Sequence, residues 1–415
     1  MEKIFLVHDG TLYTYDTLLK DLSELDKYSP FLYIKDNEPY MIFSKIIHSL
    51  VYDFPIEILD GDFSEEELRE LNIDIRDLTK VHTIENQLTF QNIDKVISRI
   101  NEVENWRLTL YTSGTTGKPK KVSHSFSMLA RNVKKHEKFG CDVWAFAFNP
   151  THMAGLQVFL QALLNQNTIV YVFGQALKKL PKLIDSYQVT SISATPTFYR
   201  NAMPYLQTGV YPSVKQVTFG GEKYDSSLEA KIQRVFKNAK INNIYASTEA
   251  GSLFTAQGGI FNIKQEHQNL IKITKRNELY VHHSLLGNSS SFLLEDEWFN
   301  TGDLVEVIDD SHFKFVSRQS DMINIGGYKV NPLEVEKVLI QVPGIKDILV
   351  KGKKNSVTGE IVIADVIKDE EVDDKELKKL IKQFASAQLQ EWKVPRIIKF
   401  VDELPMTRTG KKVRT

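Results

Sequence analysis

Between residues 106 and 250, short apolar runs alternate with longer segments whose apolar residues recur at helical spacing. The short runs are typical of strands buried on both faces, and the longer segments are typical of helices that cover a sheet. This alternation predicts βαβ units and a parallel sheet, with ligands bound beyond the carboxyl ends of the strands. The expected strands are 108–112, 143–148, 168–173, 191–194, 216–219 and 241–245, and the expected helices are 127–139, 154–165, 177–187, 197–206 and 226–238.

The two ends of the chain follow other patterns. Before residue 106 we expect helices at 13–28, 41–52 and 60–71, the last with Ser64 as its N-cap. Short strands after residue 277 predict a small antiparallel, barrel-like subdomain, and a smaller α+β unit follows Arg318. The fold class is therefore α/β, with a large N-terminal part and a small C-terminal one. The expected C-terminal elements are strands 278–281, 304–308, 313–316, 348–351, 360–366 and 397–401 and helices 332–341 and 373–392.

Composition narrows the class of protein without choosing a function. Among 415 residues, 52 Lys and Arg balance 53 Asp and Glu to give a net charge of −1. A near-neutral chain has no general attraction for nucleic acid or anionic lipid. The single cysteine, Cys141, excludes an intramolecular disulfide and a zinc–cysteine cluster. No apolar run is long enough for a signal peptide or a membrane span, so we expect a cytoplasmic protein with neither nucleic acid nor membrane as its partner.

The segment after the first expected strand has the chemistry of a phosphate-binding loop. Gly114 and Gly117 allow a sharp turn that brings backbone N–H groups toward an anion, and hydroxyl and lysine side chains add donors. The spacing differs from that of a Walker loop, because two residues separate the glycines and Pro119 follows Lys118. The alternative is a flexible turn of small residues. The donors are Ser113, Thr115, Thr116, Lys118 and Lys120, and we expect a helix to follow the loop.

Five motifs in a fixed order resemble those of the acyl-adenylate-forming superfamily, which includes acyl-CoA synthetases, nonribosomal-peptide adenylation domains and luciferases. The first is the loop itself, YTSGTTGKPKKV at 111–122. The others are Tyr245-Ala246-Ser247-Thr248-Glu249, Thr301-Gly302-Asp303, the segment 317–330 with Pro332 and Glu334 after it, and Pro405-Met406-Thr407-Arg408-Thr409-Gly410-Lys411.

The resemblance implies an enzyme with two half-reactions. A carboxylate attacks the α-phosphate of ATP with Mg²⁺ as cofactor, pyrophosphate leaves, and a thiol of CoA or phosphopantetheine then captures the acyl adenylate. The resemblance also implies a large AMP-binding domain at 1–318 with a shortened N-terminal region. A small mobile lid domain would occupy 319–415.

The same resemblance assigns roles to single residues. Glu249 would bind magnesium, Thr248 would donate to the α-phosphate, and Lys411 would reach the carboxylate and α-phosphate during adenylation. Asp303, expected in a turn between two strands, and Arg318 would hold the ribose hydroxyls. The implied nucleotide-binding residues are Thr112, Ser113, Gly114, Thr115, Thr116, Gly117, Lys118, Gly220, Gly221, Glu222, Tyr245, Ala246, Asp303 and Arg318, and the hinge and thiol-donor residues are Ser320, Asp321, Gly327 and Lys329.

The segment 149–155 resembles the part of the family that lines the carboxylate pocket, which makes His152 a fourth catalytic candidate. A hydrogen-bonded loop histidine is the structural alternative. Amino-acid-activating members usually offer an aspartate nearby, and this segment has none, which favours a plain organic acid. The pocket walls are expected to include residues 194–198.

The acceptor stays open in the sequence. The hinge motif resembles that of CoA ligases, but a free-standing enzyme can also load an acyl carrier protein, and the basic segment 118–138 could face an acidic partner. There are two alternatives: an adenylating enzyme with an amine acceptor, and a non-catalytic relative that only binds an acyl group or a nucleotide. Intact Lys411, Glu249 and Asp303 argue against the non-catalytic relative. Ala246 and Ser317 stand where the family usually has glycine.

Overall fold

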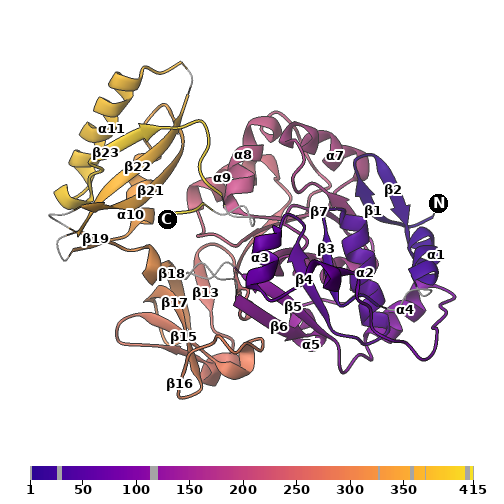
Figure 1. The fold of residues 1–415 in the computed structure, drawn as a ribbon. Coiled ribbons are helices and arrows are strands. Elements are labelled where there is room, and N and C mark those ends of the chain that lie inside the picture. The colour runs from indigo at the N-terminus through magenta and orange to yellow at the C-terminus, as the bar shows by residue number, and fades with distance from the viewer. Residues whose placement is uncertain are drawn as a thin grey trace. The chain divides into compact units, whose positions relative to one another are not determined.

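The computed structural model describes residues 2–25, 30–112, 120–325, 328–355, 359–369, 371–406 and 412–414. The chain divides into two compact units (Figure 1). The first unit comprises Met1–Leu270 and Val281–Phe299, and the second comprises Ile271–Tyr280 and Asn300–Thr415.

An eight-stranded sheet forms the centre of the first unit, in the order β12-β11-β10-β9-β7-β8-β1-β2. Its six inner strands run parallel, and the edge strands β2 and β12 pair antiparallel with their neighbours. The predicted parallel sheet is therefore confirmed. The strands are β1 (Ile4–His8), β2 (Thr11–Thr14), β7 (Val143–Phe146), β8 (Thr168–Tyr171), β9 (Ser191–Ala194), β10 (Gln216–Gly220), β11 (Lys240–Ser247) and β12 (Gly251–Ala256), followed by the short β13 (Ile260–Asn262).

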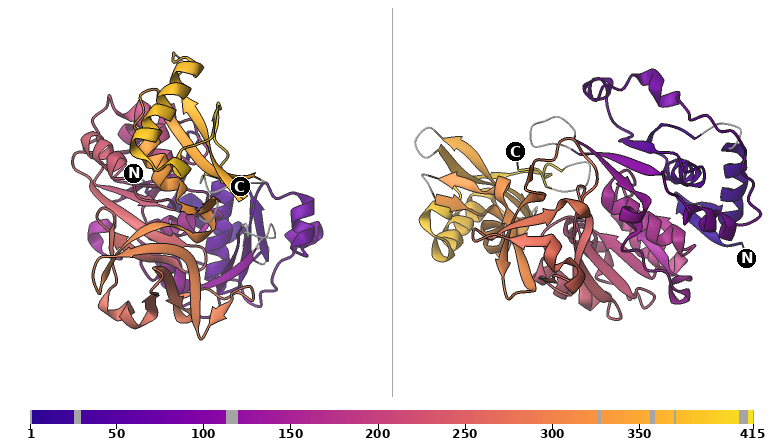
Figure 2. Two further views of the ribbon diagram at one scale, coloured as in Figure 1. Left: turned by 90° about the vertical axis from the view of Figure 1, so that its left-hand side faces the viewer. Right: turned by 90° about the horizontal axis from the view of Figure 1, so that it is seen from below.

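Apolar side chains leave this sheet on both faces. In β7, Trp144 and Phe146 enter one core while Ala145 enters the other, as the period of two in a strand requires. The first core is covered by α1 (Tyr15–Leu25), α2 (Pro39–Val51) and α6 (Met153–Leu164), and the second by α7 (Leu180–Tyr187), α8 (Pro196–Leu206) and α9 (Ser226–Val235). Figures 1 and 2 show these helices around the strands.

A second sheet of four strands, in the order β3-β4-β5-β6, completes the first unit. It contains the predicted strand at 108–112, so the expectation of one parallel sheet for all six predicted strands is wrong at this point. The segment after the expected phosphate loop is also a strand rather than a helix, and it pairs antiparallel with β5. The strands are β3 (Tyr33–Asp36), β4 (Ile56–Asp60), β5 (Arg107–Thr112) and β6 (Lys120–Ser125).

The helix predicted at 127–139 is wrong over most of its length. Only α5 (Phe126–Ala130) is helical, and a 3₁₀ turn follows at Glu137–Phe139. The backbone N–H of Lys134 donates to the side chain of Gln161 in α6 at 2.9 Å, so a tertiary contact replaces the helical hydrogen bond. Local periodicity could not reveal this competition.

The N-terminal helices lie close to their predicted positions. The segment predicted at 13–28 starts as β2 and becomes helical at Tyr15, and the helix at 41–52 is α2. Ser64 caps α3 (Glu65–Glu70) in a reciprocal capping box with Glu67, as the sequence indicated. The remaining helix of this region is α4 (Ile93–Ile100).

The C-terminal part has the predicted antiparallel and α+β character. One sheet runs β18-β17-β15-β14, with β16 paired to β17, and the last sheet packs α10 and α11 against β21 and β22 around a core of its own. The elements are β14 (Ile271–Ile273), β15 (Glu278–His282), β16 (Leu294–Glu295), β17 (Trp298–Val307), β18 (His312–Arg318), β19 (Ile323–Ile325), β20 (Tyr328–Val330), α10 (Pro332–Leu339), β21 (Ile345–Asn355), β22 (Gly359–Lys368), α11 (Asp374–Gln388) and β23 (Ile397–Phe400).

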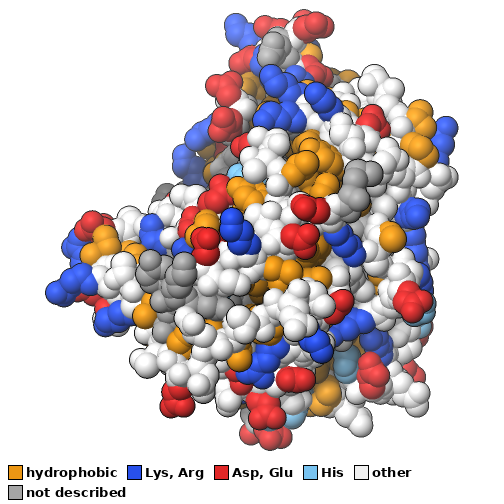
Figure 3. All heavy atoms as spheres, turned by 90° about the vertical axis from the view of Figure 1, so that its right-hand side faces the viewer, with side chains coloured by type: hydrophobic (Ala, Val, Ile, Leu, Met, Phe, Trp, Pro, Cys, Tyr) orange, Lys and Arg blue, Asp and Glu red, His pale blue; other side chains and the backbone are white. Residues whose placement is uncertain are grey.

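The surface agrees with the balanced composition. On the face shown in Figure 3, Lys and Arg side chains are interspersed with Asp and Glu. Among the described residues, none of the helices has both the length and the apolar character needed to cross a bilayer.

Candidate active site

The Thr248–Glu249 pair lies in a turn directly after β11, at the carboxyl edge of the parallel sheet. Ligands of open α/β sheets bind at this edge. Both side chains are half-buried, and the Ser247 hydroxyl accepts a hydrogen bond from the Ala250 N–H at 3.2 Å. The turn is therefore short and internally bonded, and it presents one hydroxyl and one carboxylate where a nucleotide is expected.

The two strands that flank the phosphate loop are fixed on each other. Thr112 pairs with Lys120, which brings the two ends of the loop together. Glu57 in β4 adds an anchor, because its carboxylate accepts from the Tyr111 hydroxyl and from Lys121 Nζ. The predicted loop residues Ser113, Gly114, Thr115, Thr116, Gly117 and Lys118 lie outside the described residues, as does the side chain of Thr112, whereas the predicted donor Lys120 is the first residue of β6.

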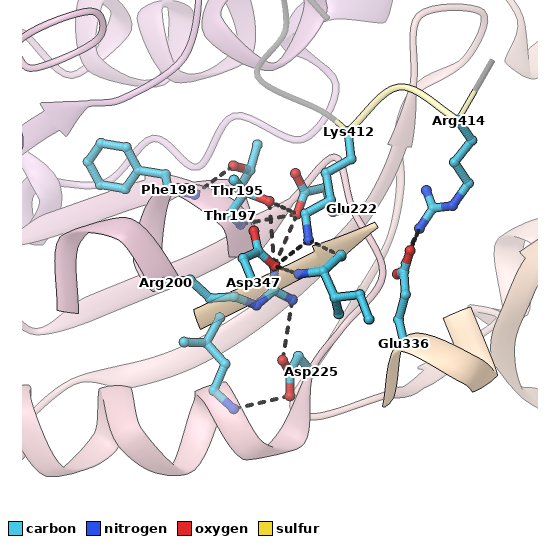
Figure 4. A network of polar contacts seen from close by, with 12 residues as sticks. Thr195, Thr197, Phe198, Arg200, Glu222, Asp225, Glu336, Asp347, Lys412 and Arg414 are labelled. Atoms are coloured by element: carbon cyan, nitrogen blue, oxygen red, sulfur yellow. Dashed lines mark hydrogen bonds and ion pairs between the residues drawn. The ribbon is translucent and has the colours of Figure 1, made fainter. Parts of the chain in front are cut away.

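Gly220 ends β10, and Gly221 and Glu222 follow it at the same sheet edge. Gly221 has φ +79°, a conformation that favours glycine. The Glu222 carboxylate accepts from the Thr197 N–H at 3.1 Å and from its hydroxyl at 2.9 Å, so it serves the start of α8 (Figure 4). The nucleotide-binding role implied for Glu222 therefore stays a prediction for its backbone rather than for its side chain.

Tyr245 and Ala246 lie at the end of β11. The Tyr245 ring packs against Phe254 and Phe261, with centroids 5.5 and 6.1 Å away, and stays half-buried. Ala246 pairs with Ser252 of β12 directly after a register shift in the ladder. The tyrosine is thus partly a core residue, and its implied nucleotide-binding role stays a prediction.

Asp60 is a site residue that the sequence analysis missed. It ends β4, its side chain is buried, and its Oδ1 lies 3.0 Å from His152 Nε2. The same oxygen accepts from Asn149 Nδ2 at 3.2 Å and from the Thr151 hydroxyl. His152 Nε2 makes no hydrogen bond despite this short distance, so its contact with the Asp60 carboxylate is one of proximity. An aspartate thus lies beside the segment 149–155 after all, supplied by a distant part of the chain.

Asp303 and Arg318, the predicted ribose contacts, belong to the second unit and face each other across the β17–β18 hairpin. Arg318 Nε lies 2.9 Å from Asp303 Oδ1. Asp303 is in β17 itself, so its predicted position in a turn between two strands is wrong; the strand simply continues through Gly302, whose φ is +72°. The Asp303 side chain is buried, at 2% exposure, while the Arg318 side chain is exposed. Arg318 is therefore the member of the pair that solvent reaches.

The predicted hinge follows this hairpin. Ser320 and Asp321 lie in a 3₁₀ turn, and the Ser320 hydroxyl donates to Asp321 Oδ1 at 3.3 Å. Ser317 is fully buried with its hydroxyl 3.5 Å from Met322 Sδ, which fills the space that a glycine would leave empty. Gly327 lies outside the described residues, and of Lys329 only the backbone in β20 is described.

Lys411 also lies outside the described residues, but the chain on both sides of it is anchored. Met406 and Lys412 form an antiparallel bridge. Lys412 Nζ binds Asp347 and donates to the Ile348 carbonyl at 2.9 Å. Arg414 Nη2 lies 2.8 Å from both carboxylate oxygens of Glu336 (Figure 4).

Among the described residues, one group outside these motifs has the composition of a metal site. Ligand atoms of His282, His283 and Glu297 lie within 4.8 Å of one another. The Ser284 N–H donates to His282 Nδ1, which leaves the hydrogen of the neutral ring on Nε2, the atom that faces Glu297 at 3.7 Å. This tautomer suits a histidine–carboxylate pair and not a metal ligand.

The fold and these residues define an adenylate-forming ligase. Two family models match the chain, the AMP-binding enzyme family at residues 45–277 and the AMP-binding enzyme C-terminal domain at residues 334–411. The chain belongs to the AMP-binding enzyme family. Its activity is the ATP-dependent activation of a carboxylic acid as an acyl adenylate, with release of pyrophosphate and transfer to a thiol, as the sequence motifs predicted.

Relatives of known function agree with this class. The chain is 28% identical over 342 residues to a 2-succinylbenzoate–CoA ligase of Listeria monocytogenes, which covers 74% of this chain and 70% of the relative. It is 26% identical over 384 residues to the enzyme of the same name from Staphylococcus aureus, with 86% and 75% covered. The ligase class and the predicted ATP and Mg²⁺ are confirmed by these comparisons. CoA, one of the two thiol donors that the sequence left open, is the co-substrate of the relatives.

Solved structures share the fold. The o-succinylbenzoate–CoA synthetase of Bacillus subtilis in complex with its acyl-adenylate intermediate superposes with a TM-score of 0.72 at 20% identity, over 100% of this chain and 94% of that one. An ATP-bound MatB from Rhodopseudomonas palustris gives a TM-score of 0.76 at 17% identity, over 99% and 94%. The predicted fold class is confirmed by these likenesses.

Proposed function

We propose that this chain is a CoA ligase for a small aromatic organic acid of the 2-succinylbenzoate type. The curated relatives bear that name, and one observation in the structure supports a plain acid over an amino acid. The structure places the Asp60 carboxylate against the segment 149–155, where its Oδ1 accepts from Asn149 and Thr151 and faces His152. It is buried and occupied, so it is poorly suited to pair a substrate ammonium group.

In the adenylation step, the chain has to position the acid and neutralise charge that develops on phosphorus. Glu249 offers the hard carboxylate ligand that Mg²⁺ prefers, and the ion neutralises phosphate charge when bound. Thr248 donates to the α-phosphate, and the phosphate loop and Lys411 contact the phosphates and the attacking carboxylate. Support for these roles comes from the position of the Thr248–Glu249 turn at the carboxyl edge of the sheet and from the motif order.

His152 orients the acid. Its Nε2 faces Asp60, which leaves Nδ1 as the ring atom available to the substrate carboxylate. Asp303 and Arg318 hold the ribose, and Tyr245 with the backbone of Gly220, Gly221 and Glu222 holds the base.

In the thiol step, we propose that the chain after Arg318 acts as a lid that pivots at Ser320 and Asp321. Gly327 would leave room for the pantetheine arm, and Lys329 would lie near the thiol donor or phosphate. A boundary at 318/319 is part of this proposal. CoA is the proposed acceptor because the relatives are CoA ligases; an acyl carrier protein is the second candidate, and we propose a cytoplasmic location where ATP and CoA are both available.

The experiment that tests the substrate is acid-dependent exchange of labelled pyrophosphate into ATP. We would compare 2-succinylbenzoate with benzoate, a straight-chain fatty acid and an α-amino acid, with Glu249→Gln as the inactive control. Exchange should depend on added acid and be fastest with 2-succinylbenzoate. Exchange that responds only to amino acids would contradict the plain-acid proposal, and exchange with none of the acids would contradict the proposed substrate class.

A second assay separates the acceptors. With the best acid, CoA, a phosphopantetheinylated carrier protein and a primary amine are each offered to the wild-type enzyme, and the acyl product is identified by mass spectrometry. We expect acyl-CoA. An acyl carrier protein or an amide as the main product would replace CoA in the proposal.

A further inference from the structure

Three segments that are far apart in the chain meet beside the Thr248–Glu249 turn. The first is β6, the strand that leaves the phosphate loop. The second is 287–289, which pairs with β6: Ser123 and Asn288 exchange both backbone hydrogen bonds, at 2.9 and 2.7 Å. The Ser289 hydroxyl extends this pairing by donating to the Lys121 carbonyl at 2.6 Å. The third segment is the turn itself.

The turn is bonded to both other segments through its main chain. His124 of β6 donates from Nε2 to the Thr248 carbonyl at 2.8 Å. The Gly287 N–H donates to the Glu249 carbonyl at 2.7 Å. The carbonyls of the two residues with predicted phosphate and magnesium roles are thus held by neutral donors from two different segments. A carbonyl fixed in this way fixes the direction in which the side chain of its own residue leaves the backbone.

His124 has little freedom to move. Its side chain is 1% exposed, and a Cβ on Gly287 would come within 2.5 Å of the imidazole ring. Gly287 therefore has two functions at once: its N–H holds Glu249, and its missing side chain leaves the space that His124 fills. The orientation of the ring requires hydrogen on Nε2, the tautomer that a carbonyl acceptor selects.

Arg131 supports the far side of the turn. Its guanidinium donates to the carbonyls of Ala250 and Ser252, the latter at 2.9 Å, and to the Leu285 carbonyl at 3.2 Å. Asn132 adds a second donor to Ser252 at 2.7 Å. Every bond described here ends on a backbone carbonyl, so these side chains cannot contribute directly to phosphate chemistry while they hold the turn.

We infer that His124 and Gly287 are positioning residues, which keep the Thr248–Glu249 turn in register with the strand that leaves the phosphate loop. The inference rests on the proposed roles of Thr248 and Glu249 in nucleotide binding. β6 then connects the two proposed parts of the nucleotide site. The phosphate loop continues directly into β6, and the Thr248–Glu249 turn is bonded to β6 through the His124 imidazole and the 287–289 segment. A shift of about 1 Å in a catalytic group can cost on the order of a hundredfold in rate.

The first test replaces the donor. His124→Leu removes the N–H and leaves the Thr248 carbonyl without it, whereas His124→Gln keeps an N–H donor at a similar reach. We expect His124→Leu to lower kcat/KM for MgATP in the pyrophosphate exchange assay by roughly ten- to a hundredfold, the loss in rate that a small misplacement of a catalytic group causes. His124→Gln should recover activity to within about threefold of wild type, since a side-chain amide can make the same bond.

A structural readout separates positioning from general instability. Amide hydrogen exchange should speed up at least about tenfold across 248–252 in His124→Leu, while β9 and α2 keep their protection. The control is Ser49→Ala, which breaks a different buried hydrogen bond of the same unit, the one that Ser49 Oγ accepts from the Trp106 indole N–H at 2.9 Å. Ser49→Ala should lower thermal stability without changing kcat/KM for MgATP.

The glycine gives an independent test. Gly287→Ala should reproduce the His124→Leu phenotype, because the added methyl group meets the ring. Gly140→Ala is the matched control, since Gly140 has an ordinary φ of −66° and its nearest contact would be 3.2 Å. The inference is overturned if His124→Leu and Gly287→Ala leave MgATP kinetics and local exchange at wild-type values. A wild-type enzyme without exchange activity would instead contradict the proposed substrate, and amide exchange would still report on the junction.

Discussion

The Thr248–Glu249 turn and the segment around Lys411 are anchored by different physical means. In the first unit the turn is held through backbone carbonyls by an imidazole, a glycine N–H and a guanidinium. In the second unit the residues after Lys411 are held by ion pairs, Lys412 with Asp347 and Arg414 with Glu336.

The difference has consequences for stability. A neutral hydrogen bond to a buried carbonyl contributes about 1 kcal/mol and responds little to salt. A buried ion pair contributes little net stability, because desolvation offsets the attraction, but the loss of one partner leaves a buried charge. A single substitution in the C-terminal ion pairs should therefore cost much stability, whereas the loss of one hydrogen bond to the turn should cost little stability and mainly shift the turn.

The largest expected effect is on the stability of the second unit. Arg414→Met should lower its free energy of unfolding by about 3–5 kcal/mol, because Glu336 is then buried without its partner. Chemical denaturation would measure the change. The double variant Arg414→Met with Glu336→Met should recover most of the loss. Arg396→Ala, which breaks an exposed pair with Glu391, is the control and should cost at most about 1 kcal/mol. An equally small loss of stability for Arg414→Met would contradict the proposed difference between the C-terminal ion pairs and the hydrogen bonds to the turn.

Next in size is the effect of Lys411 on one half-reaction. Lys411→Ala should slow adenylation by about 10²–10³, the usual loss for one preorganised donor. The enzyme should still transfer the acyl group from a supplied acyl adenylate to CoA. Pyrophosphate exchange and thiol transfer would be measured separately, with exposed Lys379→Ala as the control. Equal losses in both half-reactions would show that Lys411 does not act specifically in adenylation.

Asp60 should have a smaller effect that is confined to the acid. Asp60→Ala removes the carboxylate that accepts from Asn149 and Thr151 and faces His152, so we expect KM for the acid to rise about tenfold while KM for ATP stays the same. Asp60→Asn keeps an oxygen acceptor, so its KM for the acid should lie between those of the wild type and Asp60→Ala. Steady-state kinetics with each substrate varied in turn would check this. A change in KM for ATP alone would place Asp60 with the nucleotide instead.

The smallest expected effect is the pH dependence of the turn. Burial lowers the pKa of His124 below its ordinary value of 6.5, and Arg131 lowers it further. A histidine with a depressed pKa stabilises the fold above the unfolded pKa, and this contribution is lost as the pH falls from 6.5 toward the folded pKa. One proton limits the slope to about 1.4 kcal/mol per pH unit. The free energy of unfolding should therefore fall more steeply between pH 6.5 and 5.5 in wild type than in His124→Gln. Identical slopes would contradict the buried neutral imidazole.

The sequence predicted the elements better than their partners. Strand–helix alternation was enough to predict that β7 to β11 run parallel, and the N-cap at Ser64 was visible in the local sequence, while the reciprocal bond from Glu67 was not predicted. Periodicity could not show that 108–112 joins a second sheet, because a buried strand has the same pattern in either one. The strand after the phosphate loop and the early end of α5 were missed for a related reason, since tertiary contacts outweighed local preference.

For the site, the motifs identified the candidate functional residues but not the residues that hold them in place. Asp303 and Arg318 were both named, and the structure adds that they lie opposite each other on one hairpin. Asp60 was missed because 89 positions separate it from the Asn149 that it contacts. His124 and Gly287 were missed because a lone histidine in a strand and a lone glycine in a loop carry no periodic signal. A search for histidines next to phosphate loops could have found the first of them.

The most direct test of adenylate formation traces the carboxylate oxygen of the acid into the products. The enzyme is incubated with ATP, CoA and 2-succinylbenzoate whose carboxylates carry ¹⁸O, and the products are analysed by mass spectrometry. Attack of the carboxylate on the α-phosphate predicts one ¹⁸O atom in AMP for each acyl-CoA formed, and none in pyrophosphate. Label in orthophosphate together with ADP would show attack at the γ-phosphate and would contradict adenylate formation at this site.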